Sequence, residues 1–192
     1  MVTGTQVMNV WAIKNDLLGK VAMLVATDED GHSREFWAHF EGDGSPIHWT
    51  SRPKLAVFID KRSKKPKPRA DISPFTGDGL MINGKARDAL GDFLSQFGQL
   101  LEVDVEGQVE YYYNITNVIH CVDQVHSVKR IDGTVAKPAF IDASIPKEAS
   151  IFIDPSTVMD IYVNDAGKAE LERRIKQAGI KGMSFERMWG QA

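Results

Sequence analysis

The clearest pattern of apolar and polar positions lies between residues 80 and 105, and it predicts a strand, a helix and a second strand. Leu80–Ile82 is a short apolar run, and Asn83 after it is a residue type that caps helices. The apolar positions that follow recur at helical spacing and define one face: Ala86, Ala89, Leu90, Phe93, Leu94 and Phe97. Gly98 predicts the end of this helix. Residues 101–105 then alternate between apolar and acidic, as in a half-buried strand.

The same order returns near the C-terminus. Ile161–Val163 predicts a short strand and Asn164 a second helix cap. The sequence AGKAELERRIKQA predicts a helix rich in strong helix formers that ends at Gly179, and residues 183–188 predict the strand after it. Neither element can bury the apolar face of its helix alone, so we expect the two strand–helix–strand elements to pack on a shared sheet.

The N-terminal part is expected to be rich in β-structure. Four short runs contain many β-branched and aromatic residues: 7–13, 21–26, 35–40 and 55–59. Turn-forming clusters separate them, and Asp30-Gly31 predicts a tight hairpin. The predicted fold class is therefore α+β, with a β-rich N-terminal part followed by a mixed sheet carrying two helices from two strand–helix–strand elements.

A basic run divides the N-terminal part from the rest of the chain. Residues 61–69, KRSKKPKPR, contain six basic residues and two prolines, and the loop-forming sequence DISPFTGDG follows. Proline disfavours helix and like charges repel, so the run predicts a solvated linker rather than a patch for an acidic partner. The predicted organisation is a β-rich subdomain over residues 1–60, a linker over 61–78 and an α+β domain over 79–192, or else one continuous domain.

Composition narrows the classes of function. The 192 residues carry a formal net charge of -3, which is no electrostatic footprint for nucleic acid. A single cysteine excludes an internal disulfide framework and a cysteine-based zinc site, and it favours a reducing compartment. The N-terminus lacks the features of a signal peptide, and no apolar run approaches the roughly 18 residues of a membrane span. We therefore expect a cytoplasmic protein without a membrane partner.

The segment Val105–Val128 contains the candidate chemistry. An enzyme would use His120, Cys121 and His126, because a histidine near a cysteine can activate it as a nucleophile. If the segment is a strand, however, neighbouring side chains point to opposite faces, and His120 and Cys121 diverge. The set His120, Asp123 and His126 matches no metal-binding spacing, and no P-loop, GxGxxG or GxSxG motif occurs. We expect no catalytic residue, no metal and no cofactor.

Acidic side chains alternate along the strand that precedes this segment. Glu102, Asp104 and Glu106 would share one face, and Glu110 would lie nearby, across a turn at Gly107. A solvated strand face is the ordinary interpretation. The functional alternative is a docking surface for a basic partner, because complementary charge accelerates association. These four carboxylates are the candidate partner-binding residues.

The sequence YYYNITNVIHCVD at Tyr111–Asp123, followed by Ser127, resembles the signature of an immunity-protein family of bacterial polymorphic toxin systems. The family is the eleventh of its series and was formerly a domain of unknown function. Further segments resemble the family in the same order: 71–72, 79–90, 151–153, 159–163 and 178–185. His120 departs from the pattern, since the family usually has an acidic residue there.

The resemblance implies a cytoplasmic protein that binds a cognate toxin and neutralises it by stoichiometric occlusion. Such a role needs a complementary surface and no catalytic group. A nuclease toxin would offer a basic cleft to the carboxylates between Glu102 and Glu110. Two alternatives remain open: a small-molecule enzyme that uses the His120-Cys121-His126 region, and a structural or adaptor domain of a secretion system.

Overall fold

The structure of the protein is a computed structural model that describes residues 8–15, 17, 19–27, 34–38, 40, 42–59, 67–75, 79–157 and 160–190. One sheet has the order β10-β11-β1-β12, with strands Ile151–Phe152, Tyr162–Asn164, Val10–Lys14 and Ser184–Trp189. The larger sheet has the order β2-β3-β6-β7-β5-β4, with strands Leu24–Ala26, Lys54–Val57, Gly98–Val105, Gln108–Ile115, Leu80–Ile82 and Ile72–Ser73. The remaining elements are β8 (Val128–Lys129), β9 (Val135–Lys137), α1 (Arg34–Ala38), α2 (Gly84–Leu94), α3 (Asp165–Ala178) and a 3-10 turn at Asp142–Ser144.

Each of the two larger sheets contains one strand–helix–strand element that is split by a third strand. β5 and β6 are both antiparallel to β7, which lies between them, and β11 and β12 are both antiparallel to β1. The outer strands of each element are therefore parallel, and a helix makes the crossover that parallel strands require. The α+β class and both elements are confirmed. The expected shared sheet is wrong, because each element belongs to a sheet of its own.

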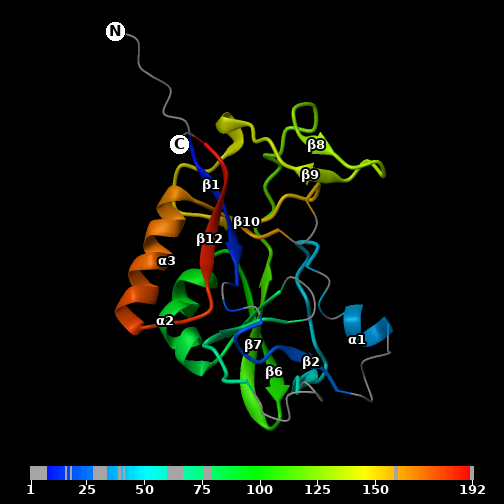
Figure 1. The fold of residues 1–192 in the computed structure, drawn as a ribbon, viewed down its shortest axis with the longest axis vertical. Helices are drawn as coiled ribbons and strands as arrows, with labels where there is room; N and C mark the ends of the chain where they lie inside the picture. The colour runs from blue at the N-terminus through cyan, green and yellow to red at the C-terminus, as the bar shows by residue number, and fades with distance from the viewer. Residues whose placement is uncertain are drawn as a thin grey trace.

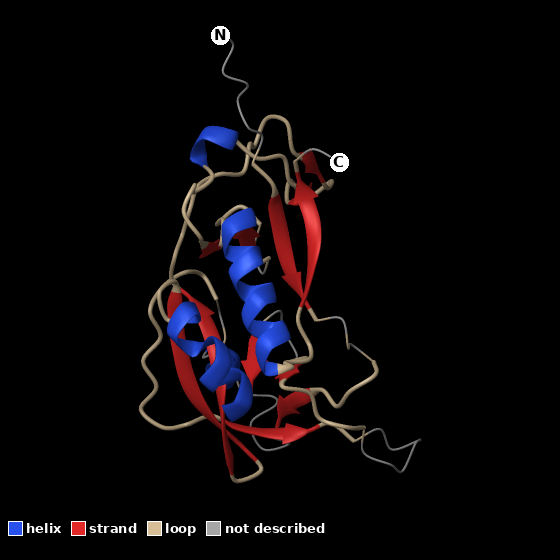
Figure 2. Ribbon diagram, turned by 90° about the vertical axis from the view of Figure 1, so that its left-hand side faces the viewer, coloured by secondary structure: helices blue, strands red, loops and turns tan. Residues whose placement is uncertain are grey.

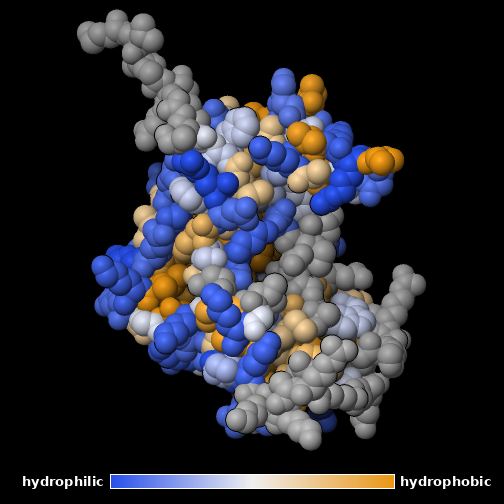
Figure 3. Space-filling model, in the orientation of Figure 1, coloured by the Kyte–Doolittle hydropathy of each residue, from blue (hydrophilic) through white to orange (hydrophobic). Residues whose placement is uncertain are grey.

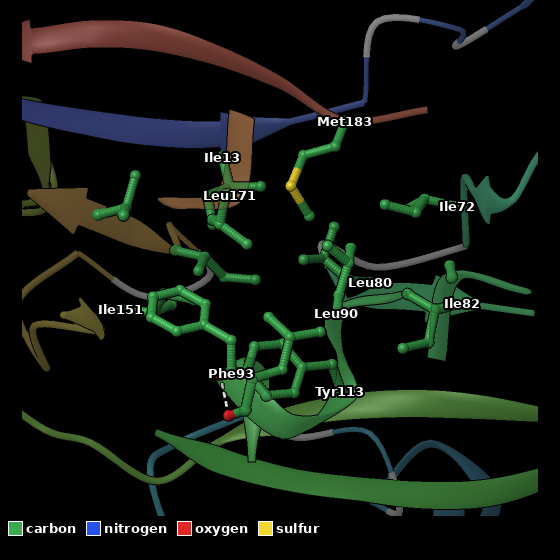
Figure 4. Packing of buried hydrophobic residues seen from close by; sticks show 14 of the residues in the cluster. Ile13, Ile72, Leu80, Ile82, Leu90, Phe93, Tyr113, Ile151, Leu171 and Met183 are labelled. Carbon is green, nitrogen blue, oxygen red and sulfur yellow. Dashed lines mark hydrogen bonds between the residues drawn. The ribbon is translucent and has the colours of Figure 1, made fainter. Parts of the chain in front are cut away.

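The two elements meet through one hydrophobic core (Figure 4). Leu90 and Phe93 of α2 lie in the same buried cluster as Leu171 of α3, and both sheets contribute side chains to it, among them Ile13 and Tyr113. The two helices lie side by side (Figures 1 and 2). The helix faces that neither element can bury alone are thus buried in a core common to both.

Ionic contacts join the two helices outside this core. Arg174 of α3 donates hydrogen bonds to both carboxylate oxygens of Asp92 on α2, and its Nε donates to Glu170 at 2.6 Å. The hydrogen bonds from Arg173 and Arg174 lower the pKa of Glu170 to about 2. Asp92 is exposed and Arg174 and Glu170 are only partly buried, so solvent screening limits what these ion pairs add to stability.

An asparagine side chain begins each of these helices, as the sequence predicts. The Oδ1 atoms of Asn83 and Asn164 each accept a hydrogen bond, at 2.9 Å, from the backbone N–H three residues later. Asn164 is fully buried and makes three more bonds. It accepts from the N–H of Ser150 at 3.1 Å and donates to the carbonyls of Pro146 and Glu148 at 2.7 and 2.5 Å. This cap therefore also holds the segment that leads into β10.

The first of these helices ends earlier than its apolar periodicity predicts. α2 stops at Leu94, and Gly98 begins β6 instead of ending the helix. A Cβ atom on Gly98 would lie 2.2 Å from the carbonyl oxygen of Asn114 on β7, so the close approach of the two strands requires glycine. The hydroxyl of Tyr113 donates to the carbonyl of Leu94 at 2.9 Å and satisfies one of the acceptors at the helix end.

The strand predicted over residues 35–40 is wrong, because Arg34–Ala38 forms the short helix α1. The rings of Phe36 and Phe40 pack together at 5.3 Å between centroids, and Phe40 packs edge-on against Tyr112 of β7 at 5.1 Å. Aromatic residues favour strands because they pack well on a pleated, half-buried surface, and other packing can override this preference. Here they cover the face of the larger sheet that lies opposite α2, and a helical turn places them there.

Strands from residues 1–60 belong to both larger sheets. β1 lies between β11 and β12, and β3 pairs in parallel with β6. The end of the predicted linker is also packed, since Pro68 accepts a hydrogen bond from the N–H of Ala22 at 2.9 Å. The loop predicted over 71–79 contains β4, an edge strand. The hairpin predicted at Asp30-Gly31 and linker residues 61–66 lie outside the described residues.

Replacing Asn164 with alanine is expected to lower the free energy of unfolding by about 3 kcal/mol, because it removes a helix cap and leaves buried backbone groups without partners. The matched variant Asn83→Ala removes the same kind of cap with fewer additional bonds and should cost about 1 kcal/mol. Urea denaturation followed by circular dichroism measures both losses. Equal losses would show that Asn164 acts only as a cap.

Candidate functional site

The candidate segment Val105–Val128 is a strand only in its first half. β7 ends at Ile115, and residues 116–127 follow an irregular path. Two isolated bridges hold that path: Val118 with Ile153, and Val122 with Phe140. The alternation of neighbouring side chains that a strand imposes therefore applies to the tyrosines of β7 and does not extend to residues 116–127.

Polar side chains of this segment are engaged inside the fold. The amide of Asn114 is fully buried and donates to the carbonyl of Ser45 at 2.9 Å. The amide of Asn117 donates to the carbonyl of Ile151 at 2.8 Å, which ties the end of β7 to the other sheet. Buried polar groups need such partners. Both amide nitrogens are bonded within the fold, so these two residues support the backbone.

A buried carboxylate that sequence reasoning missed holds the path at Cys121. Oδ2 of Asp154 accepts the N–H groups of Cys121 and Val122, both at 2.8 Å, and Oδ1 accepts the N–H and the hydroxyl of Ser156. Burial raises the pKa of Asp154, but the hydrogen bonds from Ser156, Val122 and Cys121 outweigh it and hold the pKa below its usual value. The sequence gives no signal for this role, because the partners are more than thirty residues apart.

The cysteine itself is inaccessible. Cys121 is fully buried, and its burial, with a smaller effect from the charge of Asp154, raises the pKa of the thiol to about 12. The thiolate that nucleophilic chemistry requires is therefore not formed at neutral pH. His120, by contrast, is exposed. The two side chains diverge as expected, although the backbone that carries them is not a strand.

The other histidine of the segment belongs to a surface turn. Nδ1 of His126 lies 2.6 Å from Oδ2 of Asp123, and the histidine side chain is 75% exposed. Hydrogen bonds from His126, and then from Val125, hold the pKa of Asp123 below its usual value. Ser127 donates to the carbonyl of Asp123 at 2.6 Å and accepts from the N–H of Ala139 at 2.9 Å, so its hydroxyl closes the turn. Across the described ranges, no group of three or more side chains is placed to hold a metal ion.

The four predicted carboxylates lie on two faces of the β6–β7 hairpin. Glu102 and Asp104 share one face of β6, whereas Glu110 lies opposite Val103 and points to the other face. The predicted turn is confirmed at Glu106–Gly107, which has φ angles of 53° and 85° and carries Glu106 at the tip. We call the group of Glu102, Asp104 and Glu106 the acidic end; Glu102 and Glu106 are exposed, and Asp104 is half-buried.

Glu110 is engaged by a cation instead of facing solvent. It is only 8% exposed, and both of its carboxylate oxygens accept hydrogen bonds from Nη2 of Arg69, at 2.6 and 2.7 Å. A partner would reach Glu110 only by displacing Arg69. Strand alternation could not identify this ion pair, because Arg69 stands at the end of the basic run, 41 residues away.

Cationic side chains also lie beside the acidic end. Arg52 forms an ion pair with Glu102, and Lys54 of β3 is the register partner of Asp104 on β6. These cations come from the parallel pairing of β3 with β6, which the sequence did not predict. The charge of the acidic end is thus partly offset, and Glu106 at the tip accepts a hydrogen bond from the N–H of Val57 at 3.0 Å.

Comparisons with known proteins do not place the chain in a family. No protein-family model matches it, and a search of curated proteins finds no significant match. The resemblance of Tyr111–Asp123 to an immunity family therefore stays a prediction. Within the described part of the chain, each helix is too short or too polar to cross a lipid bilayer.

Replacing Arg69 with methionine is expected to lower the free energy of unfolding by about 2 kcal/mol, because it leaves the carboxylate of Glu110 buried without a partner. Adding Glu110→Leu removes that charge as well and should recover most of the loss. Urea denaturation of the wild type, both single variants and the double variant completes the cycle. If the two losses simply add, the pair is not coupled.

Proposed function

We propose that this protein is a cytoplasmic immunity protein that binds a cognate bacterial toxin and neutralises it by stoichiometric occlusion. The resemblance of Tyr111–Asp123 to an immunity-family signature suggests this class. The burial of Cys121 is the observation that carries the proposal. It removes the only thiol from the surface and raises its pKa to about 12, so the residue is unsuited to the nucleophilic role of the enzyme alternative.

The geometry around the signature favours binding for a second reason. Asn117 and Asp154 join the signature segment to the strand β10 and the turn after it, so the segment acts as a scaffold. A scaffold of this kind holds exposed elements in fixed positions, and protein–protein recognition needs such a preorganised surface and no reacting group.

We further propose that the acidic end accelerates the approach of a toxin that carries a basic surface. Glu102, Asp104 and Glu106 lie at the outer end of the β6–β7 hairpin, and Figure 1 shows this end at the bottom of the molecule. Charge of opposite sign raises the association rate of two proteins even where it contributes little to the final affinity. Glu110 takes no part in this surface, because Arg69 covers it.

Co-expression with the product of the neighbouring coding sequence, as the candidate toxin, tests the function. The wild type is expected to rescue growth and to co-purify with the toxin domain. The triple variant His120→Ala, Cys121→Ala and His126→Ala should protect equally well, because a binder needs none of these groups. Its fold is checked by circular dichroism. Loss of protection by the folded triple variant would favour the enzyme, and failure of the wild type to rescue and co-purify would exclude the immunity role.

Reversing two charges tests the acidic end. Glu102→Lys with Glu106→Lys is expected to slow association with the toxin domain about tenfold at low ionic strength, with a smaller effect at high salt. Glu172→Lys with Glu186→Lys makes the same change of charge at exposed positions of α3 and β12 and serves as the control. Stopped-flow or surface-plasmon kinetics give the rates. Equal rates for the two double variants would place the steering charge elsewhere.

A further inference from the structure

A small hairpin stands apart from the two larger sheets. β8 and β9 form a two-stranded sheet of their own, which pairs with neither of the others. Figure 1 shows it projecting at the end of the molecule that lies opposite the acidic end. We call residues 125–137, which include both strands and their turn, the finger. Its position leaves it free to enter a concave surface.

The finger exposes aliphatic side chains that contribute nothing to the core. Val125 is 85% exposed, Val128 58% and Ile131 fully exposed, and all three fall within seven residues. Apolar atoms stand out on this projection in Figure 3. Single exposed aliphatics are common on protein surfaces, but a group of them on one projecting element marks an interaction site.

The finger is also held rigidly at its base and tip. At the base, the N–H of Asp123 donates to the carbonyl of Ala139 at 2.8 Å, and Ser127 bridges the same two residues. At the tip, Oδ1 of Asp132 accepts the N–H and the hydroxyl of Thr134, at 2.9 and 2.6 Å. A preorganised element loses little conformational entropy on binding, so its apolar side chains serve efficiently as anchors.

The charges of the finger define the chemistry of its partner. Lys129, Arg130 and Lys137 are exposed, whereas Asp132 is the one carboxylate among residues 125–137, and its Oδ1 is already engaged by Thr134. The finger is therefore locally basic in a chain whose formal net charge is -3. A complementary surface is an apolar pocket with carboxylates around its rim.

We infer that the finger seats Ile131 and Val128 in an apolar, acidic-rimmed pocket of the cognate toxin and supplies the buried anchors of the complex. This inference rests on the proposed function. A protein pocket fits better than a lipid surface, because the three exposed apolar side chains are short aliphatics and none is the tryptophan or tyrosine that favours the membrane interface. The acidic end then acts on the approach of the toxin, and the finger acts on the lifetime of the complex.

Removing the anchors tests this inference with the purified toxin domain as the probe. Ile131→Ser with Val128→Ser is expected to weaken binding about 100-fold, mainly through faster dissociation, because anchors of this kind dominate interface affinity. The control, Ile59→Ser with Val109→Ser, removes an exposed isoleucine and valine outside the finger and should change binding less than about twofold. Both double variants are checked for wild-type stability by urea denaturation.

The outcomes separate this inference from the proposed function. If the wild type binds the toxin domain and the finger variant binds as tightly as the control, the finger inference fails and the immunity role stands. If the wild type does not bind, both fail. Vesicles of equal parts phosphatidylcholine and phosphatidylserine provide the third arm. Vesicle binding by the wild type that the finger variant loses, with toxin affinity unchanged, would assign the finger to a lipid surface instead.

Discussion

The insertion of β1 between β11 and β12 is the constraint on which the rest of this structure depends. It pairs Val10 with Asn164 and Trp189, so the N-terminal strand completes a sheet whose other members come from the last quarter of the chain. The indole N–H of Trp11 also donates to Asp165 at 2.9 Å, at the start of α3. Without β1, the strands β11 and β12 have no common neighbour, and α3 has no complete sheet to cover. Closing so long a loop costs conformational entropy before any contact compensates for it, so the C-terminal element depends on the whole chain.

The common core joins the two larger sheets into one rigid unit that carries the exposed surfaces. Because α2 and α3 bury their apolar faces in the same cluster, neither element can shift without disturbing the packing of the other. The acidic end and the finger extend from opposite ends of this unit, as Figure 1 shows. The two surfaces differ in charge and shape. The acidic end is a row of carboxylates with cations beside it, and the finger is an aliphatic tip with cations around it. In the proposed complex, the first surface would affect association and the second dissociation.

The features that could be predicted from the sequence are those that depend only on residues close together in the chain. Both asparagine caps, both strand–helix–strand elements and the turn at Glu106–Gly107 follow from local spacing and residue type. The features that were missed depend on partners far along the chain. Aromatic content suggested a strand over 35–40, yet Arg34–Ala38 is a helix, and Phe40 after it packs against Phe75 and Tyr112. The acidic pattern placed Glu110 near the other carboxylates, across the turn, but the register points it to the other face, and Arg69 engages it. Periodicity identified two helices and could not reveal that an inserted strand would give each its own sheet.

The placement of the signature residues changes what the family resemblance can explain. Within Tyr111–Asp123, side chains such as Tyr113 and Asn117 close a helix end and join two sheets. A resemblance carried by such residues reports how the chain folds, and it holds little information about which partner is bound. An immunity protein must discriminate its own toxin from others, and discrimination requires surface groups that differ between partners. The finger overlaps the signature only at Ser127, and its exposed Val128 and Ile131 lie at positions that the core does not constrain. Its sequence can therefore change with the partner while the scaffold beneath it stays the same.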